Sequence, residues 1–210
     1  MKKIVMMTSM FAVLGTSAIA ETRWFVGGDS GYASPVMSDT LEDLVDEDFL
    51  KENNGSVSVS LIGGMRFGDV DKVYNGGVSV KLSYMPDIIS VKDGSELPYY
   101  LDGELDFTTL YVSYDNYVRL SGDEKYRTDL VASIGLGYGW IEETVHVDGY
   151  VPVSLDDDGM LVSFRLGVEK ETVVEGLSLQ AGFNVIALNA DDDADLQGSF
   201  GFDFGVKYTF

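Results

Sequence analysis

The chain has 210 residues, with 14 Lys and Arg against 35 Asp and Glu. The resulting net charge of −21 argues against a nucleic-acid binder, which needs a basic surface to displace counterions from phosphates. The absence of cysteine and the single histidine exclude disulfide scaffolds, Cys-zinc sites, thiol catalysis and any metal site built from several histidines.

The first 20 residues have the pattern of a secretory signal peptide. Two lysines precede a mostly apolar stretch over 4–14, and Ala18 and Ala20 form a small-x-small cleavage site. Cleavage after Ala20 would leave one domain over residues 21–210. An N-terminal membrane anchor is the alternative, but the apolar stretch is short for a spanning helix, and no later apolar run is long enough to span a membrane.

Alternation of large apolar and small residues recurs eight times along the rest of the chain, which predicts eight β-strands. The eight runs lie near residues 24–32, 57–67, 74–84, 108–114, 130–140, 160–168, 177–185 and 200–210. Their second face carries serine, glycine and asparagine rather than the Lys, Glu and Thr of a solvent-exposed face. A small polar face fits the crowded inside of a narrow barrel. We therefore predict an all-β protein, an eight-stranded antiparallel up-and-down transmembrane β-barrel.

The connections between these runs alternate in length. The long ones cover roughly 33–55, 86–104, 142–158 and 186–196, and they contain 22 acids and 2 lysines. The others, near 68–71, 116–125 and 170–176, are shorter. Outer-membrane barrels have long outer loops and short periplasmic turns, and charge is tolerated outside the bilayer but not on the lipid-facing band. In the first long connection, Asp39 and Glu42 suggest the capping box of a short helix.

The last ten residues alternate strictly and end on an aromatic residue. Their large apolar side chains share one face: Phe202, Phe204, Val206, Tyr208 and Phe210. This face resembles the C-terminal insertion signal of Gram-negative outer-membrane barrels, which the outer-membrane assembly machinery reads. With the signal peptide and eight strands, the chain resembles the small OmpA/OmpX-type, or porin family, eight-stranded barrels. The resemblance implies an outer-membrane location and contact with its lipids and lipopolysaccharide, but no particular activity, because many functions share this barrel.

Charged residues on the small face predict a polar lumen. By strand parity the inward positions include Arg23, Asp29, Arg66, Lys81, Asp115, Arg127, Asp129, Arg165, Glu169, Asp203 and Lys207. Such a nearly neutral set suits a narrow lumen, because an unpaired buried charge is costly. Arg165 and Asp203 are expected to share one ion-pair network. The network is either a gate for ions or small solutes, or a polar core that closes the barrel. We favour the core, since eight strands leave room only for their own side chains.

Catalytic and metal sites find little support. His146, between Glu143 and Asp148, could act as a general base, but it has no serine next to it in sequence and its surroundings resemble an ordinary loop. We expect it in a solvated loop or in a hairpin extension above the membrane. The acidic clusters at 156–158 and 191–195 offer oxygen ligands for Ca²⁺ or Mg²⁺, yet Leu196 breaks the EF-hand spacing. We expect solvated loops without a defined metal site or cofactor. Exchange of divalent cations with lipopolysaccharide phosphates remains compatible with them.

These features favour a non-catalytic outer-membrane barrel with acidic surface loops that serves structural integrity, surface interaction or adhesion. Its expected partners are outer-membrane lipids and lipopolysaccharide, the assembly machinery, and an extracellular partner of the loops, with no nucleic acid. The first alternative is a narrow porin-like channel for small solutes, and the second is a lipid A-modifying enzyme. The rival architecture is a soluble, lipocalin-like periplasmic calyx, which would turn the large apolar face inward.

Overall fold

The computed structural model describes residues 22–37, 50–51, 55–68, 72–86, 90–91, 101–122, 126–147, 153–189 and 196–210. Its strands are β1 (Arg23–Met37), β2 (Leu50–Lys51), β3 (Ser56–Phe67), β4 (Tyr74–Met85), β5 (Ser90–Val91), β6 (Leu101–Ser121), β7 (Thr128–Val147), β8 (Val153–Glu171), β9 (Leu177–Asn189) and β10 (Leu196–Thr209). Within these ranges no helix is long and apolar enough to cross a membrane. The expected signal peptide, and the helix expected after Asp39, lie outside the described residues.

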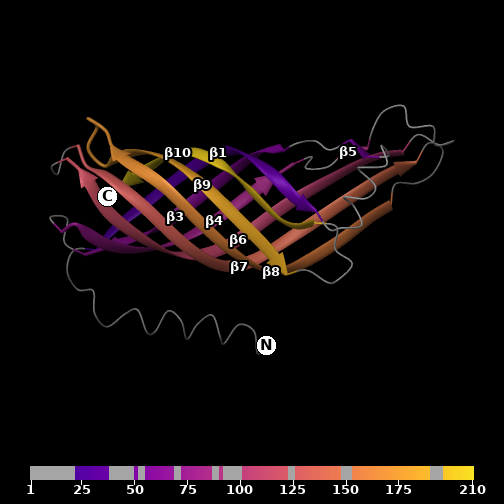
Figure 1. Ribbon diagram of the computed structural model, residues 1–210, viewed down its shortest axis with the longest axis horizontal. Helices are drawn as coiled ribbons and strands as arrows, with labels where there is room; N and C mark the ends of the chain where they lie inside the picture. The colour runs from indigo at the N-terminus through magenta and orange to yellow at the C-terminus, as the bar shows by residue number, and fades with distance from the viewer. Residues whose placement is uncertain are drawn as a thin grey trace.

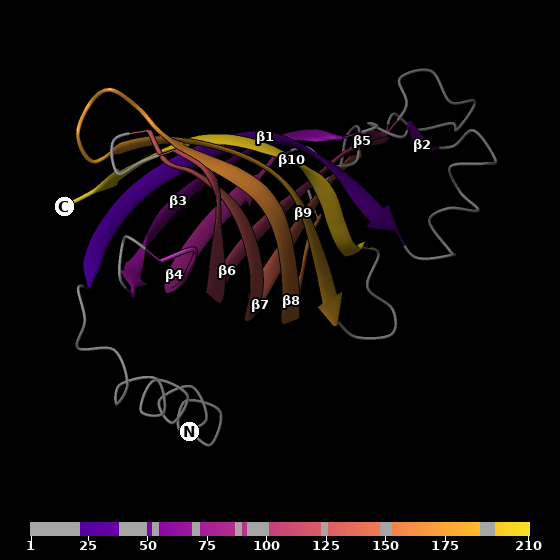
Figure 2. The same ribbon diagram turned by 60° about the vertical axis from the view of Figure 1, so that its left-hand side comes forward.

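The eight long strands form one closed antiparallel barrel (Figure 1). Their order around the barrel is β6-β4-β3-β1-β10-β9-β8-β7, and pairing of β7 with β6 completes the ring. The first and last strands meet at the β1–β10 seam, where Phe25 lies opposite Thr209. In Figure 2 the long strands curve around a common axis. The predicted eight-stranded up-and-down barrel is confirmed, and closure leaves no free sheet edge around its wall.

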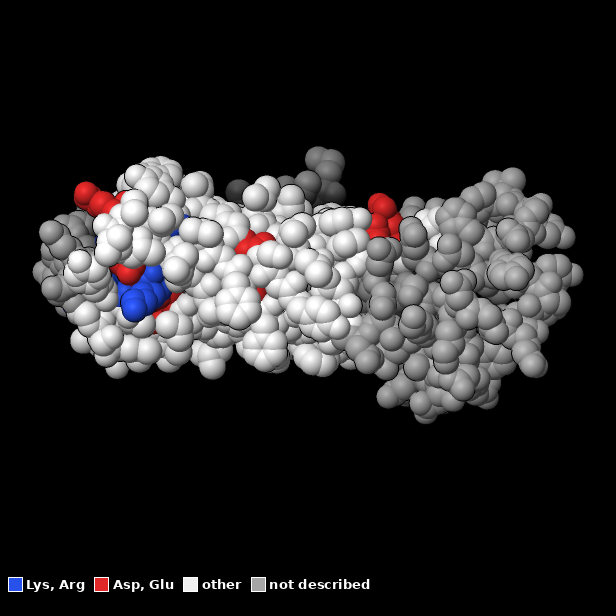
Figure 3. Space-filling model, turned by 90° about the horizontal axis from the view of Figure 1, so that it is seen from above, with Lys and Arg blue, Asp and Glu red and all other residues white. Residues whose placement is uncertain are grey.

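In the barrel wall the large apolar side chains point outward and the polar side chains point inward, which is the reverse of a water-soluble barrel. Leu61, Tyr74 and Phe204 on the outside are 69%, 73% and 68% exposed, whereas Asp203, one position before Phe204, is 1% exposed. On the face seen in Figure 3, most of the described surface carries neither Lys or Arg nor Asp or Glu. The large apolar face therefore points outward, and the lipocalin-like alternative is wrong.

The two ends of the barrel differ. The turns from β3 to β4, β6 to β7 and β8 to β9 lie at one end, together with the C-terminus; we call this the short-turn end (Figure 1). The strand ends that lead into the remaining connections lie at the opposite end, which we call the long-connection end. There the two-residue strand β5 pairs with β6, and β2 pairs with β5.

Three strands continue beyond the barrel rim at the long-connection end. Strand β4 ends where Met85 pairs with Phe107, and β9 ends where Asn189 pairs with Met160. Pairing nevertheless continues from β6 to β7 as far as Val147, and from β7 to β8 as far as Val153. We call residues 101–106, 141–147 and 153–159 the projecting sheet. It extends roughly 20 Å past the rim, at about 3.3 Å per residue.

The projecting sheet corrects two expected boundaries. Residues 142–158 were expected to form a connection, but the structure continues β7 to Val147 and starts β8 at Val153, so only 148–152 separate the two strands. Likewise β6 begins at Leu101, inside the connection expected over 86–104. The acidic residues misled the prediction: Asp and Glu are poor strand formers in isolation, but the neighbouring strands pair with their backbone groups.

Candidate functional site

The charged residues of the lumen form two clusters, and the first lies near the short-turn end. This end cluster consists of Arg66, Arg127, Asp129, Glu169 and Lys207, all buried. The Nη2 atom of Arg66 lies 2.7 Å from Oδ2 of Asp129, and Nε of Arg127 lies 2.7 Å from Oδ1 of the same carboxylate. Lys207 forms an ion pair with Glu169. Every cation of the cluster thus faces an anion from another part of the wall or from its own strand.

The ring of Tyr117 packs against two cations of the end cluster. The guanidinium of Arg66 lies 4.1 Å from its ring centroid, and the ammonium of Lys207 lies 5.0 Å from it. Both contacts fall within the range of cation–π attraction, which is stronger where the groups are desolvated. The neighbouring strand β4 leaves space for this ring, because a Cβ at Gly77 would lie 3.0 Å from Cε2 of Tyr117.

The second cluster lies further along the lumen, and we call it the middle cluster. It contains Lys81 with Asp29, joined at 2.8 Å, and Arg165 with Asp203. The Arg165 guanidinium donates from Nη2 to Oδ1 of Asp203 at 2.6 Å and from Nε to Oδ2 at 3.0 Å. Asn184 also donates to this carboxylate, at 3.0 Å. Such a two-nitrogen geometry fixes both side chains more tightly than a single contact would.

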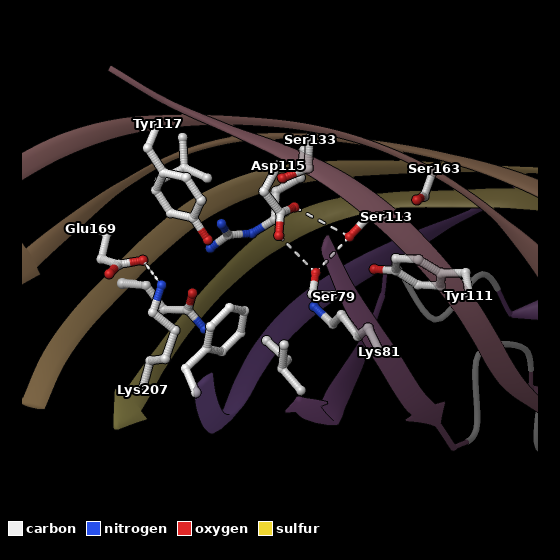
Figure 4. A pocket seen from close by; sticks show the side chains of 15 residues that line it. Ser79, Lys81, Tyr111, Ser113, Asp115, Tyr117, Ser133, Ser163, Glu169 and Lys207 are labelled. Carbon is white, nitrogen blue, oxygen red and sulfur yellow. Dashed lines mark hydrogen bonds and ion pairs between the residues drawn. The ribbon is translucent and has the colours of Figure 1, made fainter. Parts of the chain in front are cut away.

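Asp115 belongs to the middle cluster but differs from the other acids. It accepts hydrogen bonds from the hydroxyls of Ser79, at 2.8 Å, and Ser113, at 3.2 Å (Figure 4). No salt bridge joins it to another described residue. Two hydroxyl donors therefore replace a cation as its nearest partners.

The two clusters balance each other. The end cluster holds three cations and two anions, and the middle cluster holds two cations, Lys81 and Arg165, and three anions, Asp29, Asp115 and Asp203. Together the two clusters hold five charges of each sign, which lowers the cost of burying so many charges in a low-dielectric interior.

The structure places the lumen residues expected from sequence parity as follows. Asp29, Arg66, Lys81, Glu169, Asp203 and Lys207 are buried inside the barrel, and the Arg165 side chain is 13% exposed. Arg165 and Asp203 contact each other directly. Arg23 is only partly buried and lies beside Arg66 in the register of β1 and β3, near the short-turn end.

Sequence reasoning missed an apolar layer that fills the lumen at the long-connection end. We call it the apolar collar, and its buried members are Ala33, Met85, Leu105, Phe107, Tyr111, Ile141, Leu161, Ile186 and Leu188. Phe107 and Leu161 are 0% and 1% exposed. The expectation of a small polar face along the whole lumen is therefore wrong at this end. The parity of the inward residues Ser133 and Gly135, continued to Ile141, would have revealed it.

The collar also explains the inward glycines of β7. A Cβ at Gly139 would lie 2.8 Å from Cε2 of Phe107 and 2.9 Å from Cδ1 of Leu188. A Cβ at Gly135 would lie 2.9 Å from Cδ2 of Tyr111. These glycines leave room for the aromatic rings that project from the neighbouring strand β6.

A cavity of about 40 Å³ separates the end cluster from the collar, and we call it the chamber. All eight long strands contribute to its lining, so it lies within the barrel lumen. Figure 4 shows the Lys207–Glu169 pair on one side, Asp115 with its serines in the middle, and Tyr111 on the other side. A space of ~10–15 Å³ holds one water molecule, so the chamber has room for a few.

The histidine and the acidic clusters form no metal centre in the described structure. His146 lies in β7, opposite Asp102, in the projecting sheet, so of its two expected non-catalytic positions the hairpin extension is the one found. No group of three His, Cys, Asp or Glu residues suited to a metal occurs among the residues that the structure describes. The cluster at 191–195 lies outside them.

Comparison with known proteins identifies the fold. No protein-family model and no curated protein sequence matches the chain. Among solved structures, Ail, the attachment invasion locus protein of Yersinia pestis, superposes with a TM-score of 0.52 at 13% identity, covering 91% of this chain and 99% of Ail. Ail in complex with the heparin analogue sucrose octasulfate gives 0.53 at 12% identity, covering 90% and 97%. Neisserial surface protein A gives 0.45 at 11% identity, covering 89% and 97%. The fold is that of the small outer-membrane barrels.

Proposed function

We propose that this protein is a non-catalytic outer-membrane barrel whose acidic long-connection end serves surface interaction or adhesion. The observation that carries the proposal is that the barrel exposes its large apolar side chains on the outside and buries its charged side chains inside. Soluble monomers rarely expose apolar patches larger than a few hundred Å². Here apolar side chains are exposed on the outside of all eight long strands. A bilayer accepts such a surface around a closed barrel, whose backbone groups are all paired.

The aromatic residues of the outer face fit the two interfaces of a bilayer. Trp24, Tyr74 and Tyr208 are exposed near the short-turn end, and Tyr84 and Trp140 are exposed toward the long-connection end. Aromatic girdles at both interfaces are typical of membrane barrels. This arrangement supports a periplasmic position for the short turns and an outer position for the projecting sheet.

The projecting sheet supports the surface-interaction part of the proposal. Beyond the rim, β8 has no described strand beside it where β9 has ended, so residues 153–159 present a strand edge. This edge contains Asp156, Asp157 and Asp158. An exposed edge pairs readily with an extended segment of another protein, and three acids favour a basic one. The name of Ail, an attachment protein with the same fold, agrees with this role.

A shortened hairpin tests the surface role. Joining Ile141 to Asp157 through an Asn-Gly turn removes the outer part of the sheet at a paired position and uses a favoured hairpin turn. In a non-adherent Gram-negative host, the parent protein should increase adhesion to protein-coated surfaces, and the shortened variant should lose that gain. Heat-modifiable gel mobility should persist, because the barrel is intact. Equal adhesion by both variants would contradict the role.

Fractionation tests the location. The protein should enter the outer-membrane fraction, with an intact mass that begins at Glu21 after cleavage behind Ala20. A soluble protein or a retained N-terminus would contradict the proposed location.

The matched control for the shortened hairpin replaces Asp156, Asp157 and Asp158 together by Asn, because this variant keeps the strand edge and removes its charge.

The chamber favours one other function, a narrow channel for small solutes. The apolar collar argues against it, because an apolar constriction excludes water and ions. A steady current through the wild-type protein in a planar bilayer would favour the channel function. Lipid A modification is the third function, and unchanged lipid A mass spectra in cells with and without the protein would exclude it.

A further inference from the structure

The chamber lies between two layers of buried side chains that differ in chemistry. Toward the short-turn end, Tyr117, Asp129 and Lys207 are each at most 3% exposed. These three side chains are therefore almost inaccessible to water arriving from that end. Toward the other end, Phe107 and Leu161 are equally inaccessible. On β6, Tyr117 and Tyr111 both line the chamber, and they lie six positions apart, roughly 20 Å along the strand.

The chamber itself has the properties of a water site. It is lined by serine hydroxyls, by Asp115 and by charged groups of both clusters. Gln180 lines it as well and is 8% exposed, and its Nε2 atom has no hydrogen-bond partner. A buried amide donor without a partner is costly, and a bound water molecule removes that cost.

We propose that the chamber is a closed compartment holding a small cluster of water molecules, and that the barrel conducts ions only when both seals are opened. The lower seal is the end cluster with Tyr117, and the upper seal is the apolar collar. Each seal alone stops ions: the lower one by filling the bore with paired charges and a ring, the upper one by excluding water. This inference concerns the lumen and does not depend on what the projecting sheet binds.

Cysteine accessibility tests each seal separately, because the natural chain has no cysteine. Ser133 lines the chamber, so Ser133→Cys places one thiol inside it. Ser121→Cys is the matched control, since Ser121 is exposed at the end of β6. Folded protein is treated with Ag⁺, quenched and unfolded, and the thiols that remain are labelled with maleimide and counted by mass.

The proposal predicts that Ag⁺ reacts at least tenfold more slowly with Ser133→Cys than with Ser121→Cys. Adding Tyr117→Ala should open the lower seal without removing a charge, and the reaction should approach the control rate. Adding Phe107→Ala should do the same from the other side, and Leu161→Ala replaces it if that variant fails to fold. Equal rates in the two single-cysteine proteins, or no gain in either opened variant, would overturn the proposal.

Planar-bilayer recording tests the need for two openings. Tyr117→Ala alone and Phe107→Ala alone should show no steady current, whereas the double variant should conduct in unitary steps. All variants must keep heat-modifiable mobility, which shows a closed barrel. Steady current through either single variant, or none through the folded double variant, would contradict the two-seal arrangement. Neither result would touch the proposed surface role, which the shortened hairpin tests.

Discussion

The two ends of the lumen are closed by two kinds of contact, and these respond differently to mutation. In the charged part, most ion pairs join different strands, as Arg165 on β8 pairs with Asp203 on β10. In the apolar collar, Phe107 and Leu161 need only neighbours of the right volume. Removing one member of a pair leaves an uncompensated buried charge, whereas removing collar atoms leaves a void.

The lumen therefore combines two kinds of structural requirement. The charged part constrains which strand lies beside which, because a shift of register by one residue would turn Arg165 or Asp203 into the lipid. The collar tolerates exchange among apolar residues of similar size. Stability should therefore respond to partner identity in one part and to volume in the other.

The largest effect is expected from breaking one ion pair. Arg165→Ala leaves the Asp203 carboxylate buried with Asn184 as its remaining hydrogen-bond donor, which should cost about 3–5 kcal/mol of unfolding free energy. The double change with Asp203→Ala should recover part of this loss, because the two groups touch. Urea unfolding in detergent measures both. Strictly additive losses would show that the pair is not coupled.

The next effect comes from emptying the collar. Leu161→Ala should cost about 2–5 kcal/mol, because it creates a void among tightly packed apolar groups. Leu161→Met nearly conserves volume and should cost less than about 1.5 kcal/mol. The same urea titration distinguishes them. If methionine were as damaging as alanine, the collar would depend on shape rather than on volume.

The barrel and its parity were predictable because alternation is a local pattern. Ser133 faces the lumen in both the prediction and the structure, and Phe204 faces outward. The direct contact of Arg165 with Asp203 was not predictable, since it depends on register across three strands. The collar was missed because the small residues of each strand were given more weight than Phe107 and Ile141 at the same parity. The projecting sheet was missed because Glu142 and Asp157 resemble loop residues until a neighbouring strand pairs with them.

A smaller loss of stability is expected from adding a methyl group at a glycine that packs against the collar. Gly139→Ala places a methyl group against the Phe107 ring and Leu188, which should cost about 1–3 kcal/mol through overpacking. Gly63→Ala is the matched control, because nothing lies within 4 Å of the added Cβ on the outer face. Thermal unfolding in detergent compares the two variants. A loss that is the same in both would assign the effect to backbone conformation rather than to the collar.

The smallest effect on the folded barrel is expected from removing Phe210, and it separates stability from assembly. Phe210 is exposed, its ring stacks on Tyr208 with 6.4 Å between centroids, and its backbone amide donates to Trp24 at 2.9 Å. Deletion removes one hydrogen bond, so the purified barrel should lose only about 1 kcal/mol. If Tyr208 and Phe210 act as the insertion signal, outer-membrane levels should nevertheless fall several-fold, and unfolded protein should accumulate in the periplasm. His146→Ala is the control and should change neither quantity. Normal outer-membrane levels without Phe210 would show that insertion does not depend on this residue.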